Sequence, residues 1–340
     1  MRLTSTLALI PPRLAALAGL GVFGLLSLAP LLAPLPAAAQ TAATYPSRPI
    51  RIVVPFNAGS GADTSSRFYG DLLGKLLGQT VVVENRPGAS GVVAVQAVKA
   101  AAADGYTLLM ASNSPMTVNP VVMKNLPYDP IKDFRPVVGV SKGPVAFVVR
   151  AESPHKTIKD LLDATKKSGQ PLAMGNYSAG YELVGAWLGT VGGVAITPIP
   201  YKGGALMMTD IIGGQLTVGA IDSSGALPLV RDKRLRALAV TSDHRDPALP
   251  DVPTMKESGF ADFETYVWAS FFVRTETPDD VTQKLVDGFK KVLASPEGRA
   301  YQASQPGMLL DLGPAELRAF VAAEYERFKR IAQAAGIEPR

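Results

Sequence analysis

The sequence predicts an α/β protein of two lobes, each a mostly parallel β-sheet flanked by helices. From Arg48 onward, short apolar runs with strand character alternate with stretches of helical period, a pattern typical of parallel βαβ units. Two long extended segments, Val137–Val149 and Tyr266–Val273, divide this pattern into two blocks. Because the chain passes between the blocks twice, we expect a double crossover that can act as a hinge.

The first block contains three predicted strands and two predicted helices. Its first helix carries Phe68, Leu72 and Leu76 on one face, as expected for a helix that packs on a sheet. The strands are Arg51–Phe56, Thr80–Glu84 and Tyr106–Ala111, and the helices are Thr64–Leu77 and Gly91–Ala102.

The second block follows the first extended segment, which we expect to be interrupted at Gly143-Pro144. Its first helix, Lys156–Lys167, begins soon after Pro154 and directs Ile158, Leu161, Leu162 and Thr165 inward. Strands are predicted at Leu172–Met174, Ile196–Ile199, Leu216–Ile221 and Arg236–Thr241.

Two helices close the chain. The first begins at Thr277-Pro278, where the threonine caps the helix and proline occupies its first turn. We expect both helices to return to the first lobe, which then comprises residues 45–145 and 266–340, while the second lobe comprises residues 146–265. The second closing helix, Ala315–Ala335, has an apolar stripe of Leu317, Phe320, Val321, Phe328 and Ile331.

Residues 1–39 have the composition of an export signal. Arg2 and Arg13 give the basic region, Leu14–Leu35 the apolar stretch, and Ala37–Ala39 a small-residue cleavage site before Gln40. A retained membrane anchor is the alternative, but several glycines and prolines interrupt the apolar stretch. The sequence therefore predicts cleavage and a periplasmic location.

Composition excludes several classes of protein. Without Arg2 and Arg13 the chain carries 32 basic and 29 acidic residues, a net charge of +3 that is too mild and too dispersed for a nucleic-acid partner. The chain has no cysteine, which excludes disulfides, thiolate nucleophiles and iron–sulfur clusters. We expect a monomer whose apolar core carries its stability.

An enzyme is not expected either. His155 and His244 are the only histidines, and neither has a partner at the spacing of metal ligands. The string Asn176-Tyr-Ser178-Ala-Gly180 lacks the leading glycine of a nucleophile elbow. We therefore predict no catalytic residue, no metal and no cofactor, with a periplasmic hydrolase as the least favoured alternative.

The most informative junction joins the first predicted strand to the first predicted helix. A strand–turn–helix corner of this kind directs free backbone N–H groups and the positive end of a helix dipole at one point, which suits a carboxylate or a phosphate. Turn formation and helix capping are the alternative roles, and capping is favoured for the aspartate. The candidate ligand-binding residues at this corner are Asn57, Ala58, Ser60, Gly61 and Asp63.

Further candidates follow other predicted strands, at the carboxyl ends where parallel sheets bind ligands. For the serines, turn chemistry is an equal alternative, and Asp222 could receive a ligand ammonium or hydroxyl, or cap the next helix. Lys202 is expected in solvent, and Glu84-Asn85-Arg86 is expected to brace a loop. The additional candidates are Ser112, Ser114, Tyr177, Ser178, Tyr201, Gly203 and Asp222.

The chain resembles the solute receptors of tripartite tricarboxylate transporters, the Bug family, over essentially all of Tyr45–Arg340. The matching blocks, in order, are Tyr45–Phe56, Val83–Gly91, Asp104–Leu109, Tyr128–Phe134, Tyr201–Gly204 with Gly213–Gln215, and Leu235–Thr241 through Leu249–Thr254. The resemblance implies a type II-like periplasmic-binding-protein fold that holds a small organic acid in the cleft between its lobes. It also implies membrane transporter subunits as partners.

Three departures from the family pattern leave the ligand open. Ser60 replaces the second glycine of the family's first turn, Glu182 stands where a histidine is usual, and Leu206-Met207 replaces Pro-Ala. We expect these changes to alter affinity at the first corner and to rewrite the second lobe's face of the cleft. Dicarboxylates, tricarboxylates, amino acids and aromatic acids all remain candidates, and a sensor that signals to a membrane kinase is the alternative function.

Overall fold

The computed structural model describes residues 45–305 and 307–340. The predicted export signal at residues 1–39 lies outside the described residues. No described helix is both long and apolar enough to cross a membrane.

The sheet of the first lobe is parallel at one edge and antiparallel at the other. Strand β1 pairs in parallel with β2 and β3, as the alternating pattern predicts. Strand β9 then pairs antiparallel with both β3 and β4, because the long crossover strands run against the βαβ direction. In spatial order the strands are β2 (Val81–Asn85), β1 (Ile50–Val54), β3 (Thr107–Ser112), β9 (Tyr266–Arg274) and β4 (Phe134–Arg150), and β10 (Met308–Leu309) also pairs with β4.

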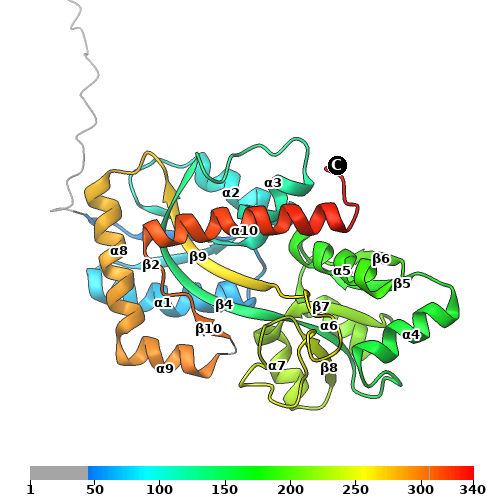
Figure 1. The fold of residues 1–340 in the computed structure, drawn as a ribbon. Helices are drawn as coiled ribbons and strands as arrows, with labels where there is room; N and C mark the ends of the chain where they lie inside the picture. Colours follow the sequence, from blue (N-terminus) through cyan, green and yellow to red (C-terminus); the bar gives the residue numbers. More distant parts are fainter. Residues whose placement is uncertain (1–44, 306) are drawn as a thin grey trace, which may run out of the picture. The chain divides into compact units, whose positions relative to one another are not determined.

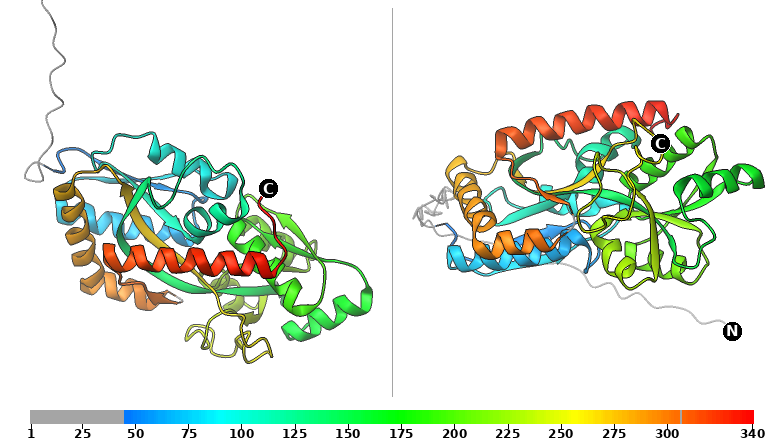
Figure 2. Two further views of the ribbon diagram at one scale, coloured as in Figure 1. Left: turned by 45° about the horizontal axis from the view of Figure 1, so that its top comes forward. Right: turned by 60° about the horizontal axis from the view of Figure 1, so that its bottom comes forward.

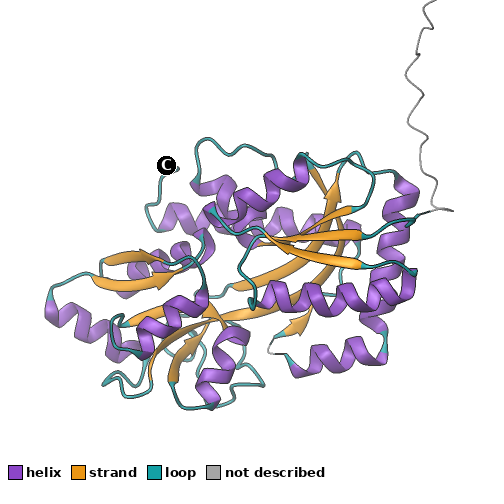
Figure 3. Cartoon of the chain, turned by 180° about the vertical axis from the view of Figure 1, so that it is seen from behind, coloured by secondary structure: helices purple, strands orange, loops and turns teal. Residues whose placement is uncertain are grey.

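The second lobe repeats this arrangement on a smaller scale (Figure 3). Strand β5 pairs in parallel with β6 and β7, while β4 pairs antiparallel with β7 and β8. The α/β class and the two-lobed binding-protein fold are therefore confirmed, with a mixed sheet in each lobe. The strands are β5 (Leu172–Asn176), β6 (Ile196–Pro200), β7 (Val218–Asp222) and β8 (Leu235–Val240).

Strand β4 joins the two sheets without a break. The expected interruption at Gly143-Pro144 is wrong, because β4 runs through this dipeptide as one strand of 17 residues. Up to Pro144 the strand pairs with β9, and from Val145 it pairs with β7. Proline cannot donate to a ladder hydrogen bond, so it fits the point where one strand leaves a sheet and enters another.

Helices cover both faces of each sheet (Figure 1). In the first lobe, α8 packs against α1 over one apolar cluster, and Figure 2 shows α8 and α9 beside α1. In the second lobe, α4 and α5 contribute to one cluster and α6 and α7 to another. The helices are α1 (Gly61–Leu77), α2 (Val92–Lys99), α3 (Asn119–Val122), α4 (Ile158–Ser168), α5 (Ala179–Gly192), α6 (Gly204–Ile212), α7 (Ser223–Arg231), α8 (Asp279–Ala294), α9 (Pro296–Ser304) and α10 (Pro314–Ala334), with short turns at Ala89–Gly91 and Ser114–Val118.

Helix α10 contributes to the cores of both lobes. Leu317 and Val321 belong to a first-lobe cluster, as the apolar stripe predicts. Phe328 and Ile331 instead join the cluster that contains α5, and the helix runs toward α5 in Figure 1. The second half of α10 therefore reaches beyond the first lobe, to which we expected it to return.

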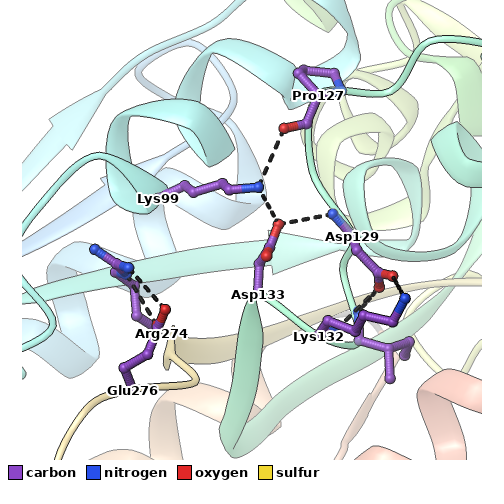
Figure 4. A network of polar contacts seen from close by, with 8 residues as sticks. Lys99, Pro127, Asp129, Lys132, Asp133, Arg274 and Glu276 are labelled. Atoms are coloured by element: carbon purple, nitrogen blue, oxygen red, sulfur yellow. Dashed lines mark hydrogen bonds and ion pairs between the residues drawn. The ribbon is translucent and has the colours of Figure 1, made fainter.

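The family-like block Tyr128–Phe134 is a structural brace (Figure 4). Asp133 accepts a hydrogen bond from Lys99 Nζ at 2.6 Å and another from the amide of Asp129 at 2.8 Å. Nearby, Arg274 pairs with Glu276 at 3.0 Å and donates to the carbonyl of Ala101. These charges fasten the loop before β4, and none of them lines the cleft between the lobes.

Candidate functional site

Two hollows lie between the lobes. The inner cavity has a volume of about 100 Å³ and lies where the N-termini of α1, α5 and α7 meet the end of β3. The outer groove, about 850 Å³, continues from it past Tyr177 and Asp222, which line both hollows. A third hollow of about 1110 Å³ runs along α5 and β6 and contains none of the predicted ligand-binding residues.

The structure divides the predicted site residues between these hollows. Asp63 lines neither, for reasons given below. Asn57, Ala58, Tyr201 and Gly203 line only the outer groove. The residues gathered around the inner cavity are Ser60, Gly61, Ser112, Ser114, Tyr177, Ser178 and Asp222.

The first corner presents unused backbone donors to the inner cavity. Ser60 caps α1, and its Oγ accepts from the amide of Asp63 at 3.3 Å. No described residue accepts a hydrogen bond from the amides of Gly61 or Ala62, and both residues line the cavity. These two donors lie at the positive end of a 17-residue helix, which favours an anion there.

Asp63 does not face the cavity and instead holds the turn before α1 in place through its carboxylate. Its carboxylate accepts from the Gly59 amide at 2.8 Å and from Asn85 Nδ2 at 3.0 Å, and it pairs with Arg67 at 2.9 Å. Burial opposes its ionisation, but the hydrogen bonds from Gly59, Arg67 and Asn85 prevail and lower the pKa of this carboxyl. The favoured interpretation of Asp63 as a capping residue agrees with these contacts.

The end of β3 contributes one hydroxyl that is free and one that is used. Ser112 Oγ is buried and has no hydrogen-bond partner among the described residues. Ser114 Oγ donates to Ser178 Oγ at 2.9 Å and accepts from the Gly180 amide at 3.2 Å, so it already joins the two lobes. Ser112 is therefore the better ligand donor of the two.

Asp222 caps α7, and its carboxylate also accepts hydrogen bonds from three hydroxyl groups. Its carboxylate accepts from the Gly225 amide at 2.8 Å and from Ser224 Oγ at 2.6 Å. Its other oxygen accepts from the phenols of Tyr177 at 2.6 Å and Tyr181 at 3.2 Å. Burial, followed by the charge of Asp222, raises the pKa of both phenols well above the usual range, so both remain donors to this carboxylate.

The three departures from the family pattern lie outside the inner cavity or on its rim. Ser60 is on the rim, Glu182 forms an ion pair with Arg340, and Leu206 is 56% exposed in the outer groove. Met207 is fully buried in the second-lobe core, so the expectation that it rewrites the cleft face is wrong. Successive residues of a helix point about 100° apart, so Leu206 on α6 can face the groove while Met207 faces the core.

Two of the cavity residues that were not predicted carry buried donors without partners. Trp268 Nε1 on β9 and Gln302 Nε2 on α9 are buried without a partner in the described part of the chain, and both residues line the inner cavity. Together with Ser112 Oγ they give three buried groups that can donate hydrogen bonds. Buried donors without partners are rare in native proteins, so these groups suit a ligand rich in acceptors.

The fold and this interlobe cavity define the class of periplasmic solute-binding proteins. The model of the tripartite tricarboxylate transporter family receptor matches residues 66–337, and the chain belongs to that family. Within residues 45–305 and 307–340, no three His, Asp or Glu side chains are grouped to hold a metal ion.

Relatives of known sequence and structure agree with this assignment. A UPF0065 protein of Bordetella bronchiseptica is 35% identical over 94% of this chain and 95% of its own length, and BugT of Bordetella pertussis is 32% identical over 88% and 93%. The periplasmic binding protein BugD has a TM-score of 0.82 at 32% identity, over 87% of this chain and all of BugD. The R. palustris protein Rpa4515 with adipate scores 0.83 at 30% identity over 87% and 100%, and MatC of Rhodopseudomonas palustris with malate scores 0.80 at 26% over 84% and 99%.

Proposed function

We propose that this protein is a periplasmic receptor that binds a small organic carboxylate in the inner cavity and delivers it to a tripartite membrane transporter. The observation that carries the proposal is the set of donors around that cavity. The amides of Gly61 and Ala62 and the buried groups of Ser112, Trp268 and Gln302 are all able to donate, and none has a partner in the described residues. A carboxylate accepts hydrogen bonds only, so its oxygens match this set.

The charge of the ligand is balanced by a helix dipole and by the Lys142 ammonium in this proposal. Lys142 lines the cavity, but its ammonium lies 3.8 Å from the ring centroid of Tyr266, where it makes a cation–π contact. The ammonium keeps its charge in that contact, so it adds to the positive potential that helix α1 supplies at the first corner. Bridging waters can complete the shell around a ligand that does not reach every donor.

The small volume of the inner cavity restricts the ligand. Its roughly 100 Å³ is well below the ~300–1,000 Å³ of pockets for drug-sized molecules. The volume favours a short aliphatic acid, and the adipate and malate bound to two structural neighbours are dicarboxylates of this kind. A longer ligand would have to extend past Tyr177 into the outer groove.

A calorimetric and thermal-shift screen tests the proposal. The mature chain, residues 40–340, is titrated with malate, adipate, citrate, aspartate and benzoate, and with the dimethyl ester of adipate as the uncharged control. We expect at least one dicarboxylate to bind and to raise the melting temperature, since a ligand of the folded form stabilises it by mass action. Equal shifts for adipate and its ester would refute an anion site.

Export and delivery need separate measurements. Mass spectrometry of the protein from a native periplasm should show a chain that begins near Gln40, and an intact N-terminus would favour a membrane anchor. Uptake of the bound acid should be lost when the gene is deleted and restored by the wild-type chain. Undiminished uptake with loss of a transcriptional response would favour the sensor.

A further inference from the structure

The first turn of α5 is capped by residues of the opposite lobe. Its own N-cap residue, Ser178, makes no side-chain cap bond. The amide of Ala179 donates instead to Ser90 Oγ at 3.0 Å, and the amide of Gly180 donates to Ser114 Oγ at 3.2 Å. Every helix leaves its first amides without internal partners, and here two first-lobe hydroxyls satisfy two of them.

Ser90, which accepts the hydrogen bond from the Ala179 amide, has a backbone conformation that is energetically unfavourable for a residue other than glycine. Four consecutive residues have positive φ: Gly88 at 139°, Ala89 at 45°, Ser90 at 53° and Gly91 at 95°. Residues other than glycine rarely adopt such angles, and they persist where surrounding contacts enforce them. One such contact is the hydrogen bond from Asn119 Nδ2 to the carbonyl of Ser90 at 3.1 Å.

A third contact reaches the same helical turn. Arg340 is anchored beside α3, because its amide donates to the carbonyl of Val122 at 3.0 Å and its carbonyl accepts from Lys124 at 3.1 Å. Its guanidinium pairs with Glu182 in the first turn of α5. The arginine side chain is 75% exposed, so this ion pair contributes little to the stability of the interlobe contact, and salt weakens it.

We infer that Ser90 and Ser114 are positioning residues that stabilise the closed form by capping α5 across the cleft. The caps exist only while the lobes are together, so their loss shifts the population toward the open form and lowers apparent affinity. Ser90 lines the outer groove and not the inner cavity, so it acts through α5 on a ligand that is held in the inner cavity. The inference rests on the proposed function, since closure matters only to a protein that closes on a ligand.

Three variants in the strained loop separate capping from folding. Ser90→Gly removes the hydroxyl and also relieves the positive φ, so the ligand-free protein should melt no lower than wild type. Its affinity for adipate or malate, whichever wild type binds, should fall about three- to ten-fold, as for an ordinary hydrogen bond, with the ranking of acids unchanged. Ser90→Asn should recover part of the affinity, because asparagine tolerates this conformation and its side-chain oxygen can accept. Ala89→Gly relieves the neighbouring positive φ without removing a donor or acceptor, and it should bind as wild type does.

Distances measured by spin labels test closure without relying on any ligand. The chain has no cysteine, so Lys75→Cys on α1 and Lys167→Cys on α4 place one label on an exposed site of each lobe. With or without the acid, Ser90→Gly should populate longer distances than Ala89→Gly. If the two variants give the same distance distributions and affinities, the inference is overturned. If neither acid binds wild type but the label distances of Ser90→Gly and Ala89→Gly still differ, the capping inference is supported. In that case the proposal of a dicarboxylate ligand is wrong.

Discussion

Asp63 and Asp222 show why an acidic residue at a helix start is ambiguous in a sequence. Such an aspartate can accept from the unpaired amides of the helix as a cap, or it can leave those amides to an anion and itself accept from a ligand ammonium or hydroxyl. In the structure each carboxylate already accepts from at least three donors of the protein, so both act as caps and braces. The donors that remain unused are backbone amides and neutral side chains, which carry no distinctive pattern in a sequence.

Substitution of Ser60 should separate the hydroxyl from the charge at the first corner. Ser60→Ala removes the cap of α1 and should weaken carboxylate binding by about 0.5–1.5 kcal/mol. Ser60→Asp keeps a capping side chain but places a like charge on the rim of the anion site, so it should weaken binding far more. Calorimetry that shows equal affinity for Ser60→Asp and wild type would place the ligand elsewhere.

Asp63 should also give the protein part of its acid sensitivity. Its pKa is lower in the folded chain than in the unfolded chain, so its contribution to stability is present above the unfolded pKa and is lost as the pH falls through the folded value. Asp63→Asn should therefore reduce the free energy of unfolding at pH 7 by about 1–3 kcal/mol. Urea unfolding at a series of pH values should show the two proteins converging in acid. Asp163→Asn, at an exposed site on α4, is the control.

At the scale of elements, periodicity found most helices but did not always find their buried face. The predicted face of α1 is wrong, since Leu76 is 47% exposed and the buried apolar side chains are Tyr69 and Leu73. The predicted stripe of α10 is buried except at Phe320, which is partly buried; its other members are Leu317, Val321, Phe328 and Ile331. Helix α9 was missed because nine residues give little more than two turns of pattern, although Ser295 and Pro296 are a start signal for it. Gln302 could not be placed in the cavity without that helix.

Trp268 illustrates a different limit. Its strand was predicted, but its place in the cavity depends on β9 lying between β3 and β4. That pairing is antiparallel and joins segments more than 100 residues apart, so no local signal specifies it. The pairing of β4 with β7, which leads β4 from one sheet to the other, is also antiparallel and far from local in sequence.

Phe328 should be one of the most sensitive positions on α10. It is fully buried in the cluster that contains α5, so Phe328→Ala should cost about 3–5 kcal/mol through lost transfer energy and a cavity. Its exposed neighbour on the same helix provides the control, since Lys329→Ala should change stability by less than ~0.5 kcal/mol. Urea unfolding of both variants measures the difference, and similar costs would show that α10 does not pack as described.

For the whole molecule, the contacts between the lobes describe a closed form. Asn57 Nδ2 donates to the carbonyl of Lys202 at 2.6 Å, and Ser114 donates to Ser178 at 2.9 Å. Both bonds join a first-lobe turn to a second-lobe turn, so opening must break them. The two crossovers, β4 and β9, supply the continuous strands about which such a motion can occur.

Ligand should therefore compact the protein, and the two lobes should have different roles in recognition. Small-angle scattering of the mature chain should give a smaller radius of gyration with the bound acid than without it, because one molecule engages both faces of the cleft.

Ser60→Ala should weaken the binding of all acids together, since the first corner binds the carboxylate that they share. Tyr177 and Tyr201 line the outer groove. Tyr177→Phe removes a donor to Asp222 and Tyr201→Phe removes a donor to Asp210, so these variants should change the ranking of acids. A reshuffled ranking for Ser60→Ala, with the wild-type ranking kept by both tyrosine variants, would reverse this division of roles.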